Sequence, residues 1–360
     1  MTERAGGPPP RLDTLGMWEA AASLPQCLRE GLRAGREVFG AHAWELGSGE
    51  PVRSVALFGL GVGGLAAEAA AAVSAPHLGL PCSVIAAGDT AGMPGFVGPD
   101  TLAFAVSCGD GTGTETADSL REALVRGSRG AVVAGEGALS HLAAESGSPR
   151  CAPATVGGPA GGVGAFGAAV VSLLVALAHV GLSTDVASSA EAAAEALARR
   201  HDTFAAPEGS AEVLARRVGR TIPIVYGGGP VSGTAARWWK ARVNRNAKAP
   251  AFAAQLPGLV HDELAGWGQG GDVTRQVMSL VLLRHTGEDP AAGALFDAVV
   301  AAVDEVMADV VEVRAEGDDD LARFLDLVAW GDFVSLFSAA REGVDPGPVP
   351  VVEELGRGSA

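Results

Sequence analysis

His261 and Glu263 stand two residues apart and could do proton-transfer chemistry. An imidazole titrates near neutral pH, so it can act as a general acid or base beside a carboxylate. The plain alternative is a histidine that packs near Trp267, six residues further along the chain. The pair therefore marks a candidate catalytic segment, with Glu263 as a second proton carrier.

A short basic stretch precedes this pair. The only two lysines of the chain, Lys240 and Lys248, lie there with three arginines, Arg237, Arg242 and Arg245. The formal charge of the whole chain is −16, so the stretch is a positive island in an acidic protein. It is interpreted either as one solvated helix face or as a site for an anionic ligand, with Asn244, Arg245 and Lys248 as binding groups.

A glycine turn opens the alternating part of the chain. Gly59-Leu60-Gly61-Val62-Gly63-Gly64 follows the apolar run Ser54–Phe58 and leads into an alanine-rich segment. This is the context of a dinucleotide fingerprint, for which Asp89 is the nearest acidic partner. A tight turn without a ligand and a cradle for a sugar phosphate, built on Gly59, Gly61 and Gly63, are the other two interpretations.

From the strand before this turn onward, predicted strands alternate with predicted helices. The predicted strands are Ser54–Phe58, Cys82–Ala87, Thr101–Ser107, Ala131–Ala134, Cys151–Val156, Thr221–Tyr226, Val277–Leu283 and Asp309–Val313. The predicted helices are Leu12–Phe39, Thr114–Arg126, Gly164–Leu182, Asp185–Ala205, Ala291–Met307 and Asp319–Ala340. Such alternation is typical of α/β proteins with a parallel sheet covered on both faces.

The pattern of strand, glycine turn and helix occurs twice, the second time at Gly227-Gly228-Gly229-Pro230. The fold class is therefore α/β with two doubly wound parallel-sheet domains and flanking helices. The predicted division is an N-terminal helical segment over 1–50, a first domain over 51–185, a connector helix over 186–220 and a second domain over 221–360. Ligands in such sheets bind at the carboxyl ends of the strands.

Composition limits the size of the domains, the cellular location and the classes of binding partner. With 360 residues, of which 48% are hydrophobic, the chain can bury two cores of ordinary size. The acidic balance disfavours nucleic acid and anionic membranes as partners. Met1 to Arg11 lacks the apolar core of a signal peptide, so a soluble cytoplasmic protein is expected. The widely spaced Cys27, Cys82, Cys108 and Cys151 are expected to be reduced thiols, and no metal site is predicted.

The segments Asn244–Phe252 and Pro257–Trp267 resemble the signature of the bifunctional phosphoglucose/phosphomannose isomerases. The family pattern reads Asn-Glu-Asn-x-Lys-x-Pro-Ala-Phe, then Pro-Glu-Leu-Asn-His-Asn-Glu-x-x-Gly-Trp. The stretch Val344–Val349 is similar to the closing motif of that family. The resemblance implies two SIS domains, a homodimer, no cofactor and a sugar-phosphate site where domains and subunits meet. It also implies aldose–ketose isomerisation through an enediolate, in which a carboxylate is the base and a histidine helps to open the ring.

The base is the main departure from this pattern. Asn244, Asn246, Lys248 and His261 match the family, but Arg245 stands where the family has its base glutamate. A guanidinium stays protonated at neutral pH, because its pKa lies above about 12, so it cannot remove a proton from the sugar.

The phosphate-binding and charge-stabilising positions depart as well. Gly63 stands where the first turn of the family has a serine, and Asp110 falls on a phosphate-binding serine of the next loop. A shift of the alignment by one or two residues would make Thr112 or Thr114 a phosphate-binding hydroxyl of this loop. The arginine that steadies the enediolate should lie near Val163, where no arginine occurs.

Three hypotheses follow. The first is a binding protein for a sugar phosphate or a related anionic metabolite, with isomerase activity lost or severely reduced. The second is an active glucose-6-phosphate/mannose-6-phosphate isomerase in which Glu263 acts as the base and Arg245 binds the anion. The third is a dinucleotide-binding enzyme that uses the turn from Gly59 to Gly64.

Overall fold

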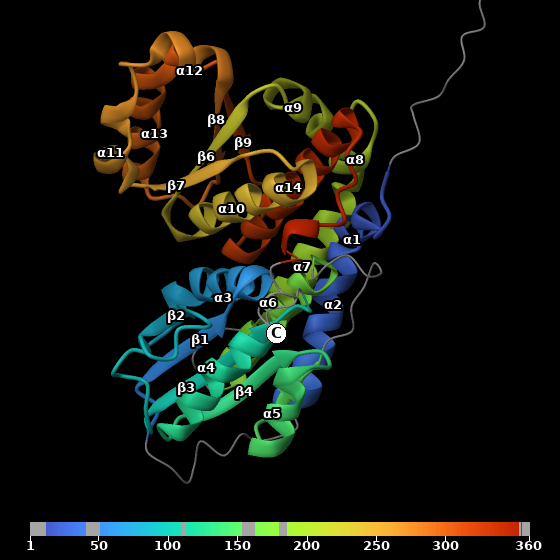
Figure 1. The fold of residues 1–360 in the computed structure, drawn as a ribbon, viewed down its shortest axis with the longest axis vertical. Coiled ribbons are helices and arrows are strands. Elements are labelled where there is room, and N and C mark those ends of the chain that lie inside the picture. The colour runs from blue at the N-terminus through green and yellow to red at the C-terminus, as the bar shows by residue number, and fades with distance from the viewer. Residues whose placement is uncertain are drawn as a thin grey trace, which may run out of the picture.

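The computed structural model describes residues 12–40, 51–109, 113–152, 163–179, 186–352 and 354. Two parallel sheets form two halves of the molecule, with helices packed around and between them (Figure 1). Helix α3 of the first half lies against α10 of the second half at their junction. The predicted α/β class with parallel sheets is confirmed.

The first sheet has the strand order β2-β1-β3-β4-β5, in which the order reverses between β1 and β3. Its strands are β1 (Ser54–Gly59), β2 (Cys82–Ala86), β3 (Thr101–Ser107), β4 (Arg129–Ala134) and β5 (Arg150–Cys151). Its helices are α3 (Gly61–Ser74), α4 (Gly113–Val125), α5 (Ala138–Ser146) and α6 (Val163–His179). The end of the fifth predicted strand, beyond residue 152, lies outside the described residues.

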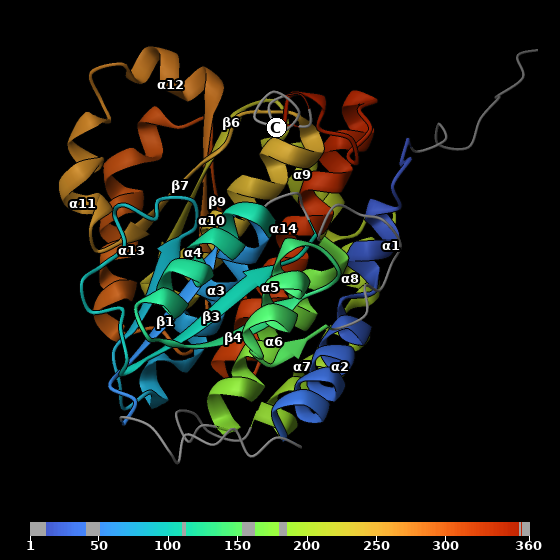
Figure 2. The ribbon, with the colours of Figure 1, turned by 60° about the horizontal axis from the view of Figure 1, so that its bottom comes forward.

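Alternating side chains of β1 and β3 enter two separate cores, because successive residues of a strand point to opposite faces. Ala56 and Phe58 pack on the side of α4 and α5, which lie over the near face of the sheet in Figure 2. Val55 and Leu57 face α3 and α6. Both faces are therefore covered, as expected for a parallel sheet.

The second sheet has the order β7-β6-β8-β9, which repeats the first four strands of the other half. Its strands are β6 (Ile222–Gly228), β7 (Phe252–Leu256), β8 (Met278–Arg284) and β9 (Asp309–Arg314). Its helices are α10 (Gly229–Arg242), α11 (Leu259–Asp262), α12 (Gly271–Val277), α13 (Pro290–Val303) and α14 (Asp320–Glu342). One face packs on α10 and α14 within the same large core that α3 and α6 enter, and the other face packs on α13.

The helices outside the sheets are more broken than predicted. The opening helix divides at Ser23 into α1 (Met17–Ala22) and α2 (Leu24–Gly35), followed by a π-helical turn over Arg36–Gly40. The connector divides into α7 (Val186–Arg199), α8 (His201–Ala205) and α9 (Ser210–Val218). Arg200 stands at the break after α7, and its guanidinium bonds Asp326 at 2.7 Å and lies over Phe204. A buried tertiary contact therefore outweighs the helix propensity of this Ala/Glu/Arg segment.

The four cysteines are free thiols; Cys82 is half-buried and the other three are buried. Burial raises the pKa of the Cys82 thiol to about 11. None of the helices in the described ranges has the length and apolar composition needed to cross a bilayer.

Candidate functional site

A cavity of about 250 Å³ lies at the carboxyl ends of β3 and β4, close to the point where the strand order reverses. Small side chains and backbone line most of it: Ser107, Cys108, Gly109, Gly113, Val133, Ala134, Gly135, Gly137, Ala138, Leu139, Ala165 and Ala169. Glu136 is the one charged residue in this lining, and its carboxylate is engaged by Arg150 at 3.0 Å and by the Ser140 hydroxyl at 3.2 Å. The cavity stands where doubly wound proteins bind their ligands.

The glycines of the first turn are required by packing. A Cβ atom on Gly63 would lie 2.4 Å from the carbonyl oxygen of Val106, and one on Gly59 would lie 2.8 Å from the backbone of Gly63. Gly61 is exposed and has a φ of 56°, a left-handed conformation that favours glycine. Close contact between α3 and the strands thus accounts for these residues without a ligand, as in the tight-turn interpretation. Asp89, the acidic partner of the dinucleotide hypothesis, is exposed and accepts a hydrogen bond from the Gly92 amide.

The next loop is described in part. Asp110 and Thr112 lie outside the described residues. Thr114 is exposed in the first turn of α4, next to Gly113, which lines the cavity. Val163, near the position expected for the enediolate-stabilising arginine, is the buried first residue of α6.

The basic stretch does not form one solvated face. Arg237 is exposed and pairs with Glu68 of α3 at 2.8 Å, and Lys240 is also exposed. Arg242, at the end of α10, is only 2% exposed. Its guanidinium lies 3.2 Å from Asp332 of α14 and donates to Asn246 at 2.8 Å. The stretch therefore combines surface charges with a buried ion pair.

Asn244, Asn246 and Lys248 are engaged within the protein. Asn244 accepts a hydrogen bond from the Ala251 amide at 2.8 Å, and buried Asn246 donates to the Ser335 hydroxyl at 2.8 Å. Lys248 donates to the carbonyl oxygens of Arg245 and Pro346. Partial burial lowers the pKa of Lys248, and the cation of Arg245 lowers it further, against the opposing charge of Asp345. These side chains fix the π-helical turn η4 (Val243–Ala247) that carries Arg245.

Arg245 is the uncommitted cation of this turn. Its guanidinium is half-buried and makes no hydrogen bond or ion pair with any described residue. Arg242 and Lys248 are close enough for Arg245 to lower the pKa of both, although burial is the larger cause for each. Three cations thus share one region, and the charge of Arg245 is left available for an anion.

Aromatic stacking brings this region next to the cavity of the first half. Trp238 of α10 stacks on Phe166 of α6 with ring centroids 3.9 Å apart, and its indole donates to Asp332 at 3.0 Å. Ala165 and Ala169, the neighbours of Phe166 on α6, line the cavity. The first turns of α6 therefore lie between the cavity and the end of α10. The sequence analysis did not predict the contacts among Phe166, Trp238 and Asp332. The signal for them was Asp332, a charged residue within the largely apolar helix α14.

His261 and Glu263 lie at a different place. His261 is exposed on the short helix α11, and Glu263 is half-buried just after it. The carboxylate of Glu263 accepts a hydrogen bond from the Tyr226 hydroxyl at 2.7 Å. Burial raises the pKa of Tyr226, and the neighbouring Glu263 raises it further, so the phenol remains a donor. The chain has one tyrosine, and this pairing was not predicted.

The two parts of the motif lie at opposite ends of strand β7, one before its first residue and the other after its last. Asn244 bonds Ala251, which directly precedes β7, whereas α11 starts three residues after β7 ends. The five residues of β7, at about 3.3 Å each, stand between them. Within one chain, Arg245 and His261 therefore do not form a common site.

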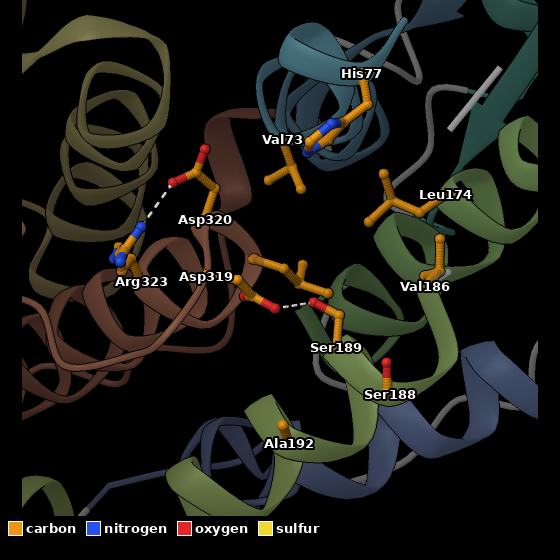
Figure 3. Close-up of a pocket in the computed structure, with 11 residues that line it drawn as sticks. Val73, His77, Leu174, Val186, Ser188, Ser189, Ala192, Asp319, Asp320 and Arg323 are labelled. Atoms are coloured by element: carbon orange, nitrogen blue, oxygen red, sulfur yellow. Dashed lines mark hydrogen bonds and ion pairs between the residues drawn. The ribbon is translucent and has the colours of Figure 1, made fainter. Parts of the chain in front are cut away.

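A larger cavity, of about 550 Å³, lies between the two halves (Figure 3). Its lining comes from α3, the turn that follows it, α6, α7 and the start of α14, away from the carboxyl ends of the strands; like the described lining of the smaller cavity, it includes none of the predicted site residues. The charged groups there already have partners: Arg323 pairs with Asp320 at 3.1 Å, and Asp319 accepts from Ser189 and caps α14 through the Ala322 amide. The smaller cavity at the strand ends is therefore the better candidate site.

Comparison with known proteins agrees with this architecture. Residues 208–357 match the model of the bacterial phosphoglucose isomerase C-terminal SIS domain. The chain is 28% identical over 263 residues to the bifunctional phosphoglucose/phosphomannose isomerase of Aquifex aeolicus, covering 73% of this chain and 77% of that protein. The corresponding enzyme of Caldicellulosiruptor bescii is 26% identical over 273 residues, with the same coverage.

Solved structures with low sequence identity share the fold. Tagatose-6-phosphate ketose/aldose isomerase from Escherichia coli superposes with a TM-score of 0.68 at 16% identity, covering 93% of this chain and 96% of that one. The C-terminal domain of glucosamine-fructose-6-phosphate aminotransferase from Francisella tularensis gives 0.66 at 14% identity, covering 93% and 98%. Residues 208–357 thus match an SIS domain, the chain shares the fold of these solved structures, and its sequence is homologous to the bifunctional isomerases.

Proposed function

We propose, on the premise of this homology to bifunctional phosphoglucose/phosphomannose isomerases, that the chain is an SIS protein that binds a sugar phosphate or a related anionic metabolite. We propose further that its isomerase activity is lost or severely reduced. The observation that carries the proposal is Arg245, a half-buried cation that pairs with no residue in the described ranges and stands where proton abstraction requires a carboxylate.

The surroundings of Arg245 support anion binding. Arg242 is neutralised by Asp332, and Lys248 is held by carbonyl oxygens, so a ligand would meet Arg245 as the free charge. A guanidinium binds phosphate oxygens through two parallel hydrogen bonds, a geometry that one ammonium group cannot offer. The phosphate or carboxylate of the ligand would lie against η4, and its sugar part would extend toward the cavity beside α6.

The placement of His261 supports a homodimer as part of the same proposal. Because His261 and Glu263 lie across the second sheet from Arg245, they can reach a ligand at Arg245 only from a second copy of the chain. The site would then form where domains and subunits meet, in a cytoplasmic enzyme-like dimer with domain boundaries near residues 51, 186 and 221.

Titration calorimetry with glucose 6-phosphate and mannose 6-phosphate tests the binding claim. We expect Arg245→Gln to weaken binding by about 10- to 100-fold, because a hydrogen bond to a charged group contributes about 1.5–3 kcal/mol. Arg275→Gln is the matched control, since Arg275 is an exposed surface arginine paired with Asp272. Equal affinities of Arg245→Gln and wild type would refute the site, and a turnover of several per second in a coupled isomerase assay would refute the loss of activity.

An active isomerase with rearranged roles is the second candidate, favoured by the Tyr226–Glu263 hydrogen bond of 2.7 Å. That bond holds a carboxylate in one orientation, as a general base requires. If Glu263 is the base, Glu263→Gln and His261→Ala should each lower the turnover of glucose 6-phosphate by at least about 100-fold. Wild-type turnover that survives either substitution would exclude this candidate.

A further inference from the structure

The loop after β8 corresponds to the loop after β3 in the other half. In each half this strand is the third in the chain and pairs with the first strand across the point where the strand order reverses. Five residues separate β3 from α4, and five separate β8 from α13. The carboxyl end of β8 is therefore equivalent in topology to the carboxyl end of β3, beside which the smaller cavity lies.

Arg284 and Glu288 form an ion pair at the carboxyl end of β8. Arg284, the last residue of β8, has a side chain that is 10% exposed, and its Nε donates to Glu288 at 2.8 Å. The side chain of Glu288 is 6% exposed, and its other oxygen accepts a hydrogen bond from the His285 amide at 2.8 Å. One carboxylate therefore takes a guanidinium and a backbone amide as donors, the two kinds of group that bind anions at strand ends.

An aromatic ring and a second carboxylate also lie close to Arg284. The Phe296 ring lies 4.3 Å from the guanidinium carbon of Arg284. A Cβ atom on Gly228, the last residue of β6, would lie 2.7 Å from that same ring. Glu312 approaches Arg284 at 3.4 Å, but it is 37% exposed and also pairs with Arg314. Glu288 is thus the principal anion in a preformed cradle.

We propose that Arg284 and the amide of His285 form an anion-binding cradle that Glu288 fills as an internal ligand. Removal of the Glu288 carboxylate would open a second site, fitted to a small carboxylate or to phosphate. While Glu288 is in place, this cradle binds no external anion, so anion binding by the natural chain comes from other sites. This inference does not depend on Arg245 or on isomerase chemistry.

Rescue by added anions tests the cradle. In Glu288→Ala the buried Arg284 loses its principal partner, so the variant should be less stable than wild type, and formate, acetate or inorganic phosphate should restore stability in a saturable manner. At an anion concentration ten times its dissociation constant, the unfolding equilibrium constant should fall about 11-fold by mass action. Chloride at equal ionic strength is the reference for general salt effects.

Two further variants separate this effect from others. Glu288→Gln still fills the cradle, so the same anions should stabilise it no more than they stabilise wild type. Glu312→Ala removes the half-exposed partner and leaves the cradle occupied, so it should also show no rescue. If Glu288→Ala does not fold alone, the yield of folded protein is measured against acetate concentration. Equal rescue of Glu288→Ala and Glu288→Gln, or no rescue of Glu288→Ala by any of the three anions, would overturn the proposal.

Discussion

At saturating substrate, Arg245→Glu should raise the turnover number for glucose 6-phosphate isomerisation by about 100-fold over wild type, although the loss of the cation weakens substrate binding. The change places a carboxylate where the related isomerases have their base, between the cations of Arg242 and Lys248. Those cations would keep the carboxylate ionised, and thus able to accept a proton, at neutral pH. General bases contribute about 10²–10⁴-fold, and we expect the lower end because the arginine missing near Val163 and the altered phosphate loop remain.

Arg245→Gln is the control for this gain. It removes the same positive charge and has similar size, but an amide cannot act as the base. At saturating substrate the turnover number should therefore stay at the wild-type level in a coupled assay of fructose 6-phosphate formation. A rise in both variants would mean that the cation merely inhibits. No rise in Arg245→Glu would mean that the residue at this position does not limit the rate.

Asp332→Ala should lower the free energy of unfolding by about 3–5 kcal/mol at neutral pH. The substitution leaves the guanidinium of Arg242, which is 2% exposed, without its counter-ion and removes the acceptor of the Trp238 indole. Urea unfolding followed by tryptophan fluorescence measures the loss. Asp272→Ala, which breaks the exposed pair with Arg275, should cost no more than about 1 kcal/mol. Similar losses in the two variants would contradict a structural role for the buried pair.

The pH dependence of this effect has a defined sign. Burial raises the pKa of Asp332 from 3.8 to about 6, although Arg242 acts in the opposite direction. Between these two values the folded state holds more protons than the unfolded state. The part of the stability that comes from the raised pKa of Asp332 is therefore fully present below pH 3.8 and is lost as the pH rises through about 6, whereas the ion pair with Arg242 remains at neutral pH. The difference in unfolding free energy between wild type and Asp332→Asn should decrease over this range; an increase would show that Arg242 dominates.

Most of the fold could be predicted because its strands are apolar and short. Thr101–Ser107 is a strand with the predicted bounds, because it is a largely apolar run whose first six residues are all buried. The strand β7 was missed: Phe252–Leu256 contains two alanines and a glutamine, and its pairing with β6 supplies the stabilisation that its composition lacks. Val277, predicted to begin a strand, instead ends helix α12.

The site was less predictable because neighbours in sequence are separated in space. Asn244–Trp267 reads as one motif, yet β7 runs through its middle and carries its two ends to opposite edges of a sheet. The partners of the motif are also distant in sequence: Ser335 accepts a hydrogen bond from Asn246 in its first part, and Tyr226 donates one to Glu263 in its second part. Spacing along the chain carries no information about such contacts. The sequence therefore predicted which residue types belong to the site but not how they are arranged in space.

The close contact of Gly63 with the Val106 carbonyl limits how the protein could regain a phosphate-binding turn. A serine introduced at this position would bring its Cβ atom against backbone, which cannot swing aside as a side chain can. Helix α3 would first have to retreat from the sheet, and α10 and the Phe166–Trp238 stack would have to follow it. A serine at this position therefore requires a compensating shift of α3 as well as the substitution itself.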